Sequence, residues 1–111
     1  HTVRNEWLPR LRAFKPQLIL LSAGFDAHRD DPLGDTRLHE ADYAWLTHKI
    51  IQSAPQCGGK IVSVLEGGYH LPSLAAAAAA HLYVLAGLGK PPCAVEYEQL
   101  LKREEEKNQA V

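Results

Sequence analysis

The sequence predicts an α/β fold with parallel strands, and three observations lead to this prediction. Two short apolar runs, residues 18–21 and 61–65, have the length and composition of buried strands. A stretch with helical spacing lies between them, over residues 38–54. A strand, a helix and a second strand in this order form a right-handed crossover, which makes the two strands parallel neighbours.

The first half of the chain contains a helix, a strand, a loop and a second helix. Apolar residues at spacings of three and four predict the first helix over 3–14, with Pro9 either starting or kinking it. The first strand is expected over 17–22 and is followed by a loop over 25–36 that is rich in aspartate, glycine and proline. The helix over 38–54 should end before a proline and a pair of glycines.

The second half contains a strand, a short loop and two helices. The strand is expected over 60–65 and the following helix over 71–86, where a run of alanines suits close packing against a sheet. Beyond this helix the composition becomes charged, which predicts a solvated terminal helix. We therefore divide the chain into an α/β segment, residues 1–89, and a proline-led charged terminal helix or tail, residues 90–111.

Two parallel strands are too few to form a stable sheet alone. Sheets need about three or more strands for independent stability, and parallel sheets need cover on both faces. The missing strands must come from other parts of a longer polypeptide or from a second copy of this chain. The chain begins with His1 and contains no methionine, which favours a piece of a longer polypeptide. When the chain is alone, we expect its open strand edges to recruit another copy, giving a homo-oligomer.

The composition argues against several classes of partner. Twelve basic and thirteen acidic residues give a formal net charge of −1, so direct nucleic-acid binding is not expected. The chain has no apolar run of about 18 residues, so no membrane partner is expected. Cys57 and Cys93 are too few for a disulfide scaffold and lack C-x-x-C spacing, which favours reduced thiols and a cytoplasmic location.

The loops that leave the carboxyl ends of the two strands are where a parallel α/β sheet holds ligands. The first loop carries Asp26, His28, Asp30 and Asp31, whose side chains could bind zinc or could serve as turn and cap residues. The second loop places Tyr69 after two glycines, where its hydroxyl could donate to a developing oxyanion or its ring could pack at the strand end. Because the two strands are neighbours, Asp26 and Tyr69 could face one site.

Three motifs in these loops carry a family resemblance. They are Ser22-Ala23-Gly24-Phe25-Asp26-Ala27-His28, Asp31-Pro32-Leu33-Gly34 and Leu65-Glu66-Gly67-Gly68-Tyr69. In this order and separation, over about residues 14–87, the chain resembles the carboxyl-terminal third of the histone deacetylase and acetylpolyamine amidohydrolase family, nearest its class II branch. The resemblance implies a partial arginase-like three-layer α/β fold with parallel strands and flanking helices. It also implies zinc-dependent hydrolysis of acetyl-lysine or acetylpolyamine amides.

The resemblance assigns roles to individual residues. Asp26 is similar to one of the family's zinc-binding aspartates, and Tyr69 to the tyrosine that stabilises the tetrahedral oxyanion. Leu33 matches the apolar rim of the acyl-lysine tunnel, and Gly67 and Gly68 match the tunnel wall.

Other polar residues of the chain are expected to have structural roles. Asp31 should fix its loop rather than bind metal, and His28 receives no role. The histidines at positions 39, 48, 70 and 81 are expected to be surface or packed residues.

Two functional hypotheses follow from the resemblance. In the first, the chain is a segment of a zinc-dependent deacetylase and supplies one zinc ligand and the oxyanion tyrosine. The isolated chain is then expected to be inactive, because a catalytic zinc needs about three protein ligands and the resemblance assigns the catalytic histidines and the other ligands to no residue here. In the alternative, the chain is a non-catalytic module that self-associates through its open sheet edge.

Overall fold

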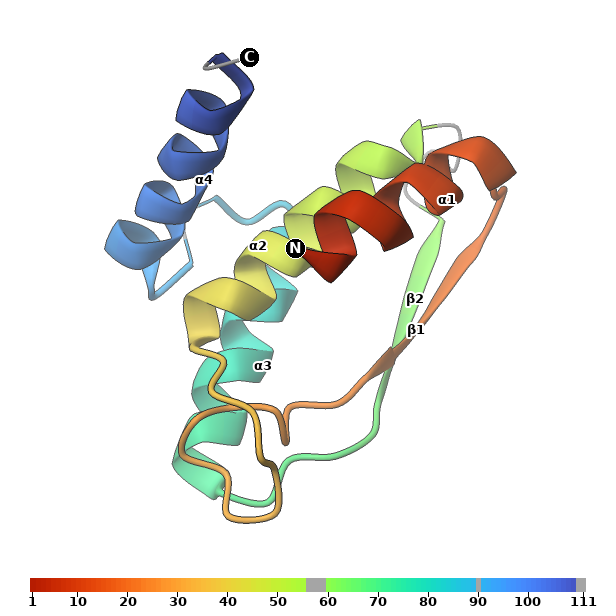
Figure 1. The fold of residues 1–111 in the computed structure, drawn as a ribbon. Coiled ribbons are helices and arrows are strands. Elements are labelled where there is room, and N and C mark those ends of the chain that lie inside the picture. The colour runs from red at the N-terminus through yellow and green to blue at the C-terminus, as the bar shows by residue number, and fades with distance from the viewer. Residues whose placement is uncertain (56–59, 90, 110–111) are drawn as a thin grey trace.

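The computed structural model describes residues 1–55, 60–89 and 91–109, and it confirms the α/β prediction. Strands β1 (Ile19–Ala23) and β2 (Ile61–Leu65) form a parallel pair, with Ile19 opposite Ile61 and Ala23 opposite Leu65. Helix α2 (Glu40–Ser53) makes the crossover between them. The strand pair lies at one side of the molecule, with the helices packed on one of its faces (Figure 1). Cys57 lies outside the described residues.

The first helical region is divided into two parts rather than being one helix. A π-helical segment, η1 (Val3–Trp7), leads into the α-helix α1 (Leu8–Phe14), and Pro9 falls in the first turn of α1. Proline has no backbone N–H and is tolerated only in the first turn of an α-helix. The α-helix therefore begins at Leu8, just before Pro9. This agrees with the prediction that Pro9 either starts or kinks the helix.

Small side chains join α2 to α3 (Leu71–Leu85). Ala44 of α2 and Ala77 of α3 are completely buried, and Ala41 and Ala80 are nearly so. Alanine adds no bulk beyond Cβ, so two helices lined with it can approach closely while keeping high helix propensity. The alanine run thus packs α3 against α2.

A buried histidine ties the sheet to both of these helices. His81 of α3 lies 2.8 Å from the Ser63 hydroxyl of β2 and 2.7 Å from the Thr47 hydroxyl of α2. Thr47 donates its own proton to the Tyr43 carbonyl, so the Nδ1–H of His81 donates to Thr47 and Nε2 accepts from Ser63. Burial lowers the pKa of His81 and thereby favours this neutral form.

The charged terminal helix, α4 (Ala94–Gln109), is docked on α2 rather than solvated on all sides. Tyr97 and Leu100 pack against a core cluster that contains Cys93. One turn further along, the buried Glu104 carboxylate pairs with Lys49 and accepts a hydrogen bond from the Trp45 indole at 3.3 Å. The prediction of a solvated helix was wrong for the face of α4 that contacts α2. The buried face continues from Tyr97 and Leu100 to Glu104, and a charged residue gives no sign of burial in the sequence.

The sheet has an uncovered face, as expected for a pair of strands without further partners. Leu20 is 70% exposed, and its neighbour in register, Val62, is 49% exposed. Val64 is also exposed and lies two positions after Val62, on the same face, and the exposed Leu18 lies just before β1, two positions before Leu20. An apolar face of this kind, bordered by unpaired strand edges, favours association.

The isolated chain is therefore expected to self-associate at micromolar concentration. Replacing Leu20 and Val62 together by lysine should shift it to a monomer, because charge on the open face opposes its burial. Light scattering checks this, with Leu88→Lys as the control, since Leu88 is also exposed but lies beyond the end of α3 and outside the strands. A folded, strictly monomeric parent chain would contradict the expectation.

Candidate active site

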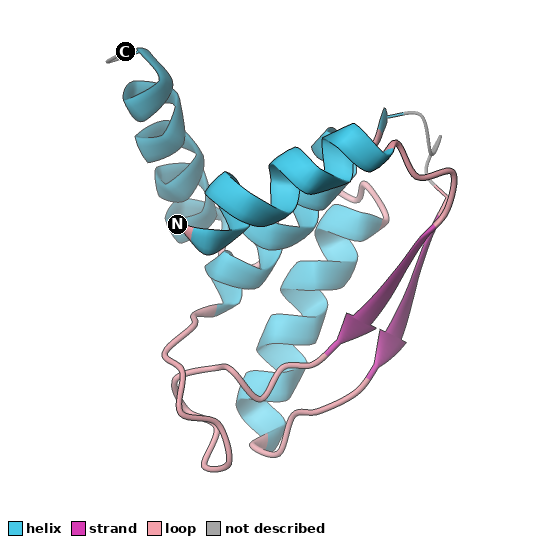
Figure 2. Cartoon of the chain, turned by 45° about the vertical axis from the view of Figure 1, so that its right-hand side comes forward, coloured by secondary structure: helices cyan, strands magenta, loops and turns pink. Residues whose placement is uncertain are grey.

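The candidate site lies where β1 and β2 end. Figure 2 shows both strands pointing toward the same end of the molecule, where the two predicted loops run side by side. Backbone hydrogen bonds join these loops: Phe25 N–H donates to the Gly67 carbonyl at 2.7 Å, and Glu66 N–H donates to the Ala23 carbonyl at 3.0 Å. The loops therefore extend the parallel pairing beyond the sheet and form one surface.

Asp26 sits in a cradle of glycines contributed by both loops. A Cβ added at Gly67 would lie 3.0 Å from the Asp26 carboxylate carbon, and one added at Gly24 would lie 3.1 Å from its Oδ1. A Cβ at Gly34 would lie only 1.6 Å from the Asp26 carbonyl oxygen, so any other residue at this position would force the loop backbone to move. These glycines leave the room that the Asp26 side chain and backbone occupy between the two loops.

The Asp31 carboxylate joins the two loops. Its Oδ1 accepts from the N–H of Leu33 at 2.9 Å, and its Oδ2 accepts from the N–H of Tyr69 at 2.7 Å. Burial acts to raise the pKa of Asp31, but hydrogen bonds from backbone N–H groups, that of Tyr69 foremost, outweigh it and lower the pKa below its usual value. Asp31 thus fixes its loop, as expected from the sequence.

Tyr69 and Leu33 present their side chains to the outside. Tyr69 is 57% exposed and Leu33 is 71% exposed, so both can contact another molecule or another part of a larger domain. Gly68, just before Tyr69, has a φ of 146°, and a Cβ there would lie 2.6 Å from Leu74 Cδ1. The positive φ is the reason that this position favours glycine, since a shift of the Leu74 side chain could relieve the contact.

The Asp26-Ala27-His28 segment has the spacing of an Asp-x-His ligand pair, but the structure directs the histidine elsewhere. His28 is 1% exposed, and its Nε2 lies 3.0 Å from a Glu40 carboxylate oxygen. Its Nδ1 accepts from the N–H of Asp30 at 3.1 Å. Both ring nitrogens are occupied, so His28 supports the loop and does not join Asp26 as a metal ligand.

The other histidines have structural partners, as expected. His39 and His70 begin α2 and α3, where their Nδ1 atoms accept from Ala41 N–H and Ser73 N–H. His48 packs edge-on against the Tyr97 ring. Histidine is not a preferred N-cap residue, so the sequence contained no signal for these two caps.

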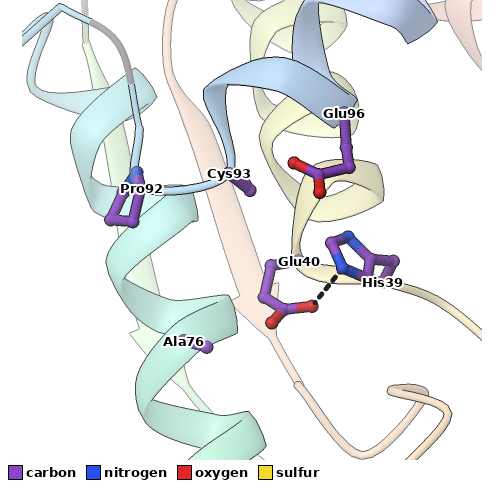
Figure 3. A pocket seen from close by; sticks show the side chains of 6 residues that line it. All are labelled: His39, Glu40, Ala76, Pro92, Cys93 and Glu96. Atoms are coloured by element: carbon purple, nitrogen blue, oxygen red, sulfur yellow. Dashed lines mark ion pairs between the residues drawn. The ribbon is translucent and has the colours of Figure 1, made fainter.

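A pocket elsewhere in the molecule contains residues that could bear chemistry. Figure 3 shows it where the start of α2, helix α3 and the start of α4 meet, with His39, Glu40, Cys93 and Glu96 among its lining residues. Burial raises the pKa of the Cys93 thiol, so Cys93 is a poor nucleophile. None of the residues predicted for the site lines this pocket.

Whether this site could hold a metal ion depends on the side chains that could act as ligands. Asp26 supplies one carboxylate, closely lined by Gly24 and Gly67, and a carboxylate is a suitable zinc ligand. Within residues 1–55, 60–89 and 91–109, no group of three or more His, Cys, Asp or Glu side chains could hold a metal ion. Zinc at Asp26 would thus need ligands from beyond the described part of the chain.

Together, these features define an α/β protein with a polar site at the carboxyl ends of parallel strands. The Histone deacetylase domain family model matches residues 1–85, and the chain belongs to this family. Within the described ranges, no helix combines the length and hydropathy needed to cross a bilayer.

Relatives and solved structures agree with this assignment. The chain is 56% identical over 66 residues to type-2 histone deacetylase 2 of Dictyostelium discoideum, an alignment that covers 59% of this chain and 4% of that protein. It is 45% identical over 80 residues to histone deacetylase 15 of Arabidopsis thaliana, covering 72% of this chain and 14% of that protein. It is 42% identical over 85 residues to the polyamine deacetylase HDAC10 of Mus musculus, covering 77% of this chain and 12% of that protein.

The crystal structure of the HDA15 HD domain superposes with a TM-score of 0.72 at 41% identity, covering 84% of this chain and 25% of that chain. The histone deacetylase Clr3 gives the same TM-score at 32% identity and covers 84% of this chain and 16% of that one. The chain therefore has a histone deacetylase fold but spans a quarter or less of each protein compared. Its parallel strands and flanking helices form part of that fold, as predicted.

Proposed function

We propose that this chain supplies two loops of the active site of a zinc-dependent deacetylase that hydrolyses acetyl-lysine or acetylpolyamine amides. The observation that carries the proposal is that Asp26 and Tyr69 lie on loops hydrogen-bonded to each other at the ends of paired strands. Homologues described as histone deacetylases and as a polyamine deacetylase support both substrate classes.

Each residue has a defined chemical task in this proposal. Asp26 would be one of the ligands of zinc, which when bound polarises an amide carbonyl and lowers the pKa of water. The Tyr69 hydroxyl would donate a hydrogen bond to the oxyanion that forms as the carbonyl carbon becomes tetrahedral. Leu33 would line the rim of the channel for the acylated amine, and Gly67 and Gly68 would let the backbone form the channel wall.

The proposal is tested on a complete domain that carries this segment. Such a domain should hydrolyse an acetyl-lysine peptide, an acetylated polyamine or both, lose this activity after treatment with a chelator and regain it with zinc. Activity that survives complete metal removal would contradict the proposal.

The isolated 111-residue chain should bind no zinc tightly, since Asp26 would lack the other ligands. Equilibrium dialysis checks this expectation. Stoichiometric tight binding that Asp26→Ala abolishes would mean that the metal site is complete within this chain.

The uncovered sheet face favours a second candidate function, that of a self-associating module without catalysis. In that case the occupant of the face is a second copy of the chain. The module is preferred if the isolated chain forms stable oligomers through Leu20 and Val62 and a complete domain shows no amide hydrolysis. We propose a cytoplasmic location for either form, on the basis of the cysteine content of the chain.

A further inference from the structure

The Asp31 carboxylate uses its two oxygens on different parts of the candidate site. Oδ1 holds the N–H of Leu33, two residues away, whereas Oδ2 holds the N–H of Tyr69, which is 38 residues away in the sequence. Asp31 is 5% exposed, and a carboxylate is buried without a large cost only when hydrogen bonds replace its water. Hydrogen bonds to an ionised acceptor are short and strong, as the 2.7 Å bond to Tyr69 is.

Tyr69 needs such a restraint more than an ordinary core tyrosine does. Its side chain is 57% exposed, so packing fixes it only in part. Two glycines precede it, and Gly68 adopts a φ of 146°. Glycine restricts the backbone dihedral angles less than any other residue, so the chain that leads to Tyr69 is intrinsically flexible. The hydrogen bond from its N–H to Asp31 acts at the residue that carries the phenol.

We infer that Asp31 is a positioning residue of the reaction, which sets where the Tyr69 hydroxyl lies by holding the Tyr69 backbone. This inference rests on the proposed function, in which Tyr69 supports the oxyanion. The same carboxylate holds Leu33, so the oxyanion donor and the channel rim keep a fixed relation to each other. Misplacing a catalytic group by about 1 Å can cost about 10²-fold in rate, so a loss of this restraint is measurable.

The experiment is a double-mutant cycle in a complete domain that carries this segment. Asp31→Asn keeps the size of the side chain but replaces one acceptor oxygen by an NH₂ group, which cannot accept from a backbone N–H. Alone, it should lower kcat by about tenfold or more and change KM less, with zinc content unchanged. In a Tyr69→Phe background, it should lower kcat by less than about twofold, because the hydroxyl that Asp31 positions is already absent.

Asp35→Asn is the matched control, since Asp35 is an exposed aspartate in the same loop. It should leave kcat unchanged in both backgrounds. If Tyr69→Phe lowers kcat but Asp31→Asn has the same fold effect with and without it, Asp31 acts independently of Tyr69 and the inference is overturned while the proposed function stands. If Tyr69→Phe leaves kcat unchanged, the proposed function itself fails.

A second variant covers the case in which Asp31→Asn yields too little folded protein. Asp31→Glu keeps the charge and both oxygens but moves them by one methylene. It should show the same dependence on the Tyr69 hydroxyl in the cycle, and an additive effect would again overturn the inference.

Discussion

Tyr69→Phe in a complete domain that carries this segment is expected to lower kcat by about 10²-fold or more, with a smaller change in KM. The substitution removes the hydroxyl and keeps the ring, so the exposed phenol loses only its ability to donate to an oxyanion. A hydrogen bond formed mainly in the transition state contributes to kcat rather than to substrate binding. Steady-state kinetics on an acetyl-lysine peptide measures both parameters.

Tyr83→Phe is the control for this prediction. Tyr83 lies on α3, is 37% exposed and takes no part in the two loops of the site. Its loss of a hydroxyl should leave kcat unchanged. A Tyr69→Phe domain with unaltered turnover would remove the oxyanion role from Tyr69.

Asp26→Asn should abolish both zinc retention and activity in the same complete domain. Replacing a hydrogen-bonding partner of a zinc ligand already costs about 10- to 100-fold in metal affinity, so losing the charge of a ligand itself should cost more than about 100-fold. The change is nearly isosteric, so the space beside Gly24 and Gly67 should still accept the side chain. Zinc content measured after dialysis, together with activity, reports the effect.

Asp35→Asn again serves as the control and should keep its zinc. If Asp26→Asn retains a full equivalent of zinc and normal turnover, Asp26 is a structural residue of the loop. Loss of zinc accompanied by unfolding would be recognised by circular dichroism and distinguished from loss of a ligand in a folded domain.

The sequence was most informative where one local pattern determines one element. Both strands, the crossover helix and α3 lie within two residues of their predicted bounds, because short apolar runs and helical spacing act locally. The division of the first helix at Pro9 also follows from local chemistry. The docking of α4 could not be predicted in this way, because the burial of Glu104 depends on Lys49 and Trp45, which are more than 50 residues away.

The candidate site shows the same limit. Asp26 and Tyr69 stand out by residue type, and the parallel topology predicts that their loops are neighbours. The sequence alone could not show why glycine is needed at particular positions of these loops. Gly34 is required because its Cβ would collide with the Asp26 backbone, and Gly67 because its Cβ would press on the Asp26 carboxylate. Likewise, Asp31 reaches Tyr69 only once both loops are folded.

The most direct test of the central claim is a diffraction experiment at the zinc absorption edge on a complete domain that carries this segment, bound to an acetyl-lysine peptide. We expect an anomalous peak about 2.0–2.2 Å from an Asp26 carboxylate oxygen. We also expect the Tyr69 hydroxyl within hydrogen-bonding distance of the acetyl carbonyl oxygen. A zinc ion bound without Asp26, or an acetyl group bound out of reach of Tyr69, would contradict the assignment of these two loops to the active site.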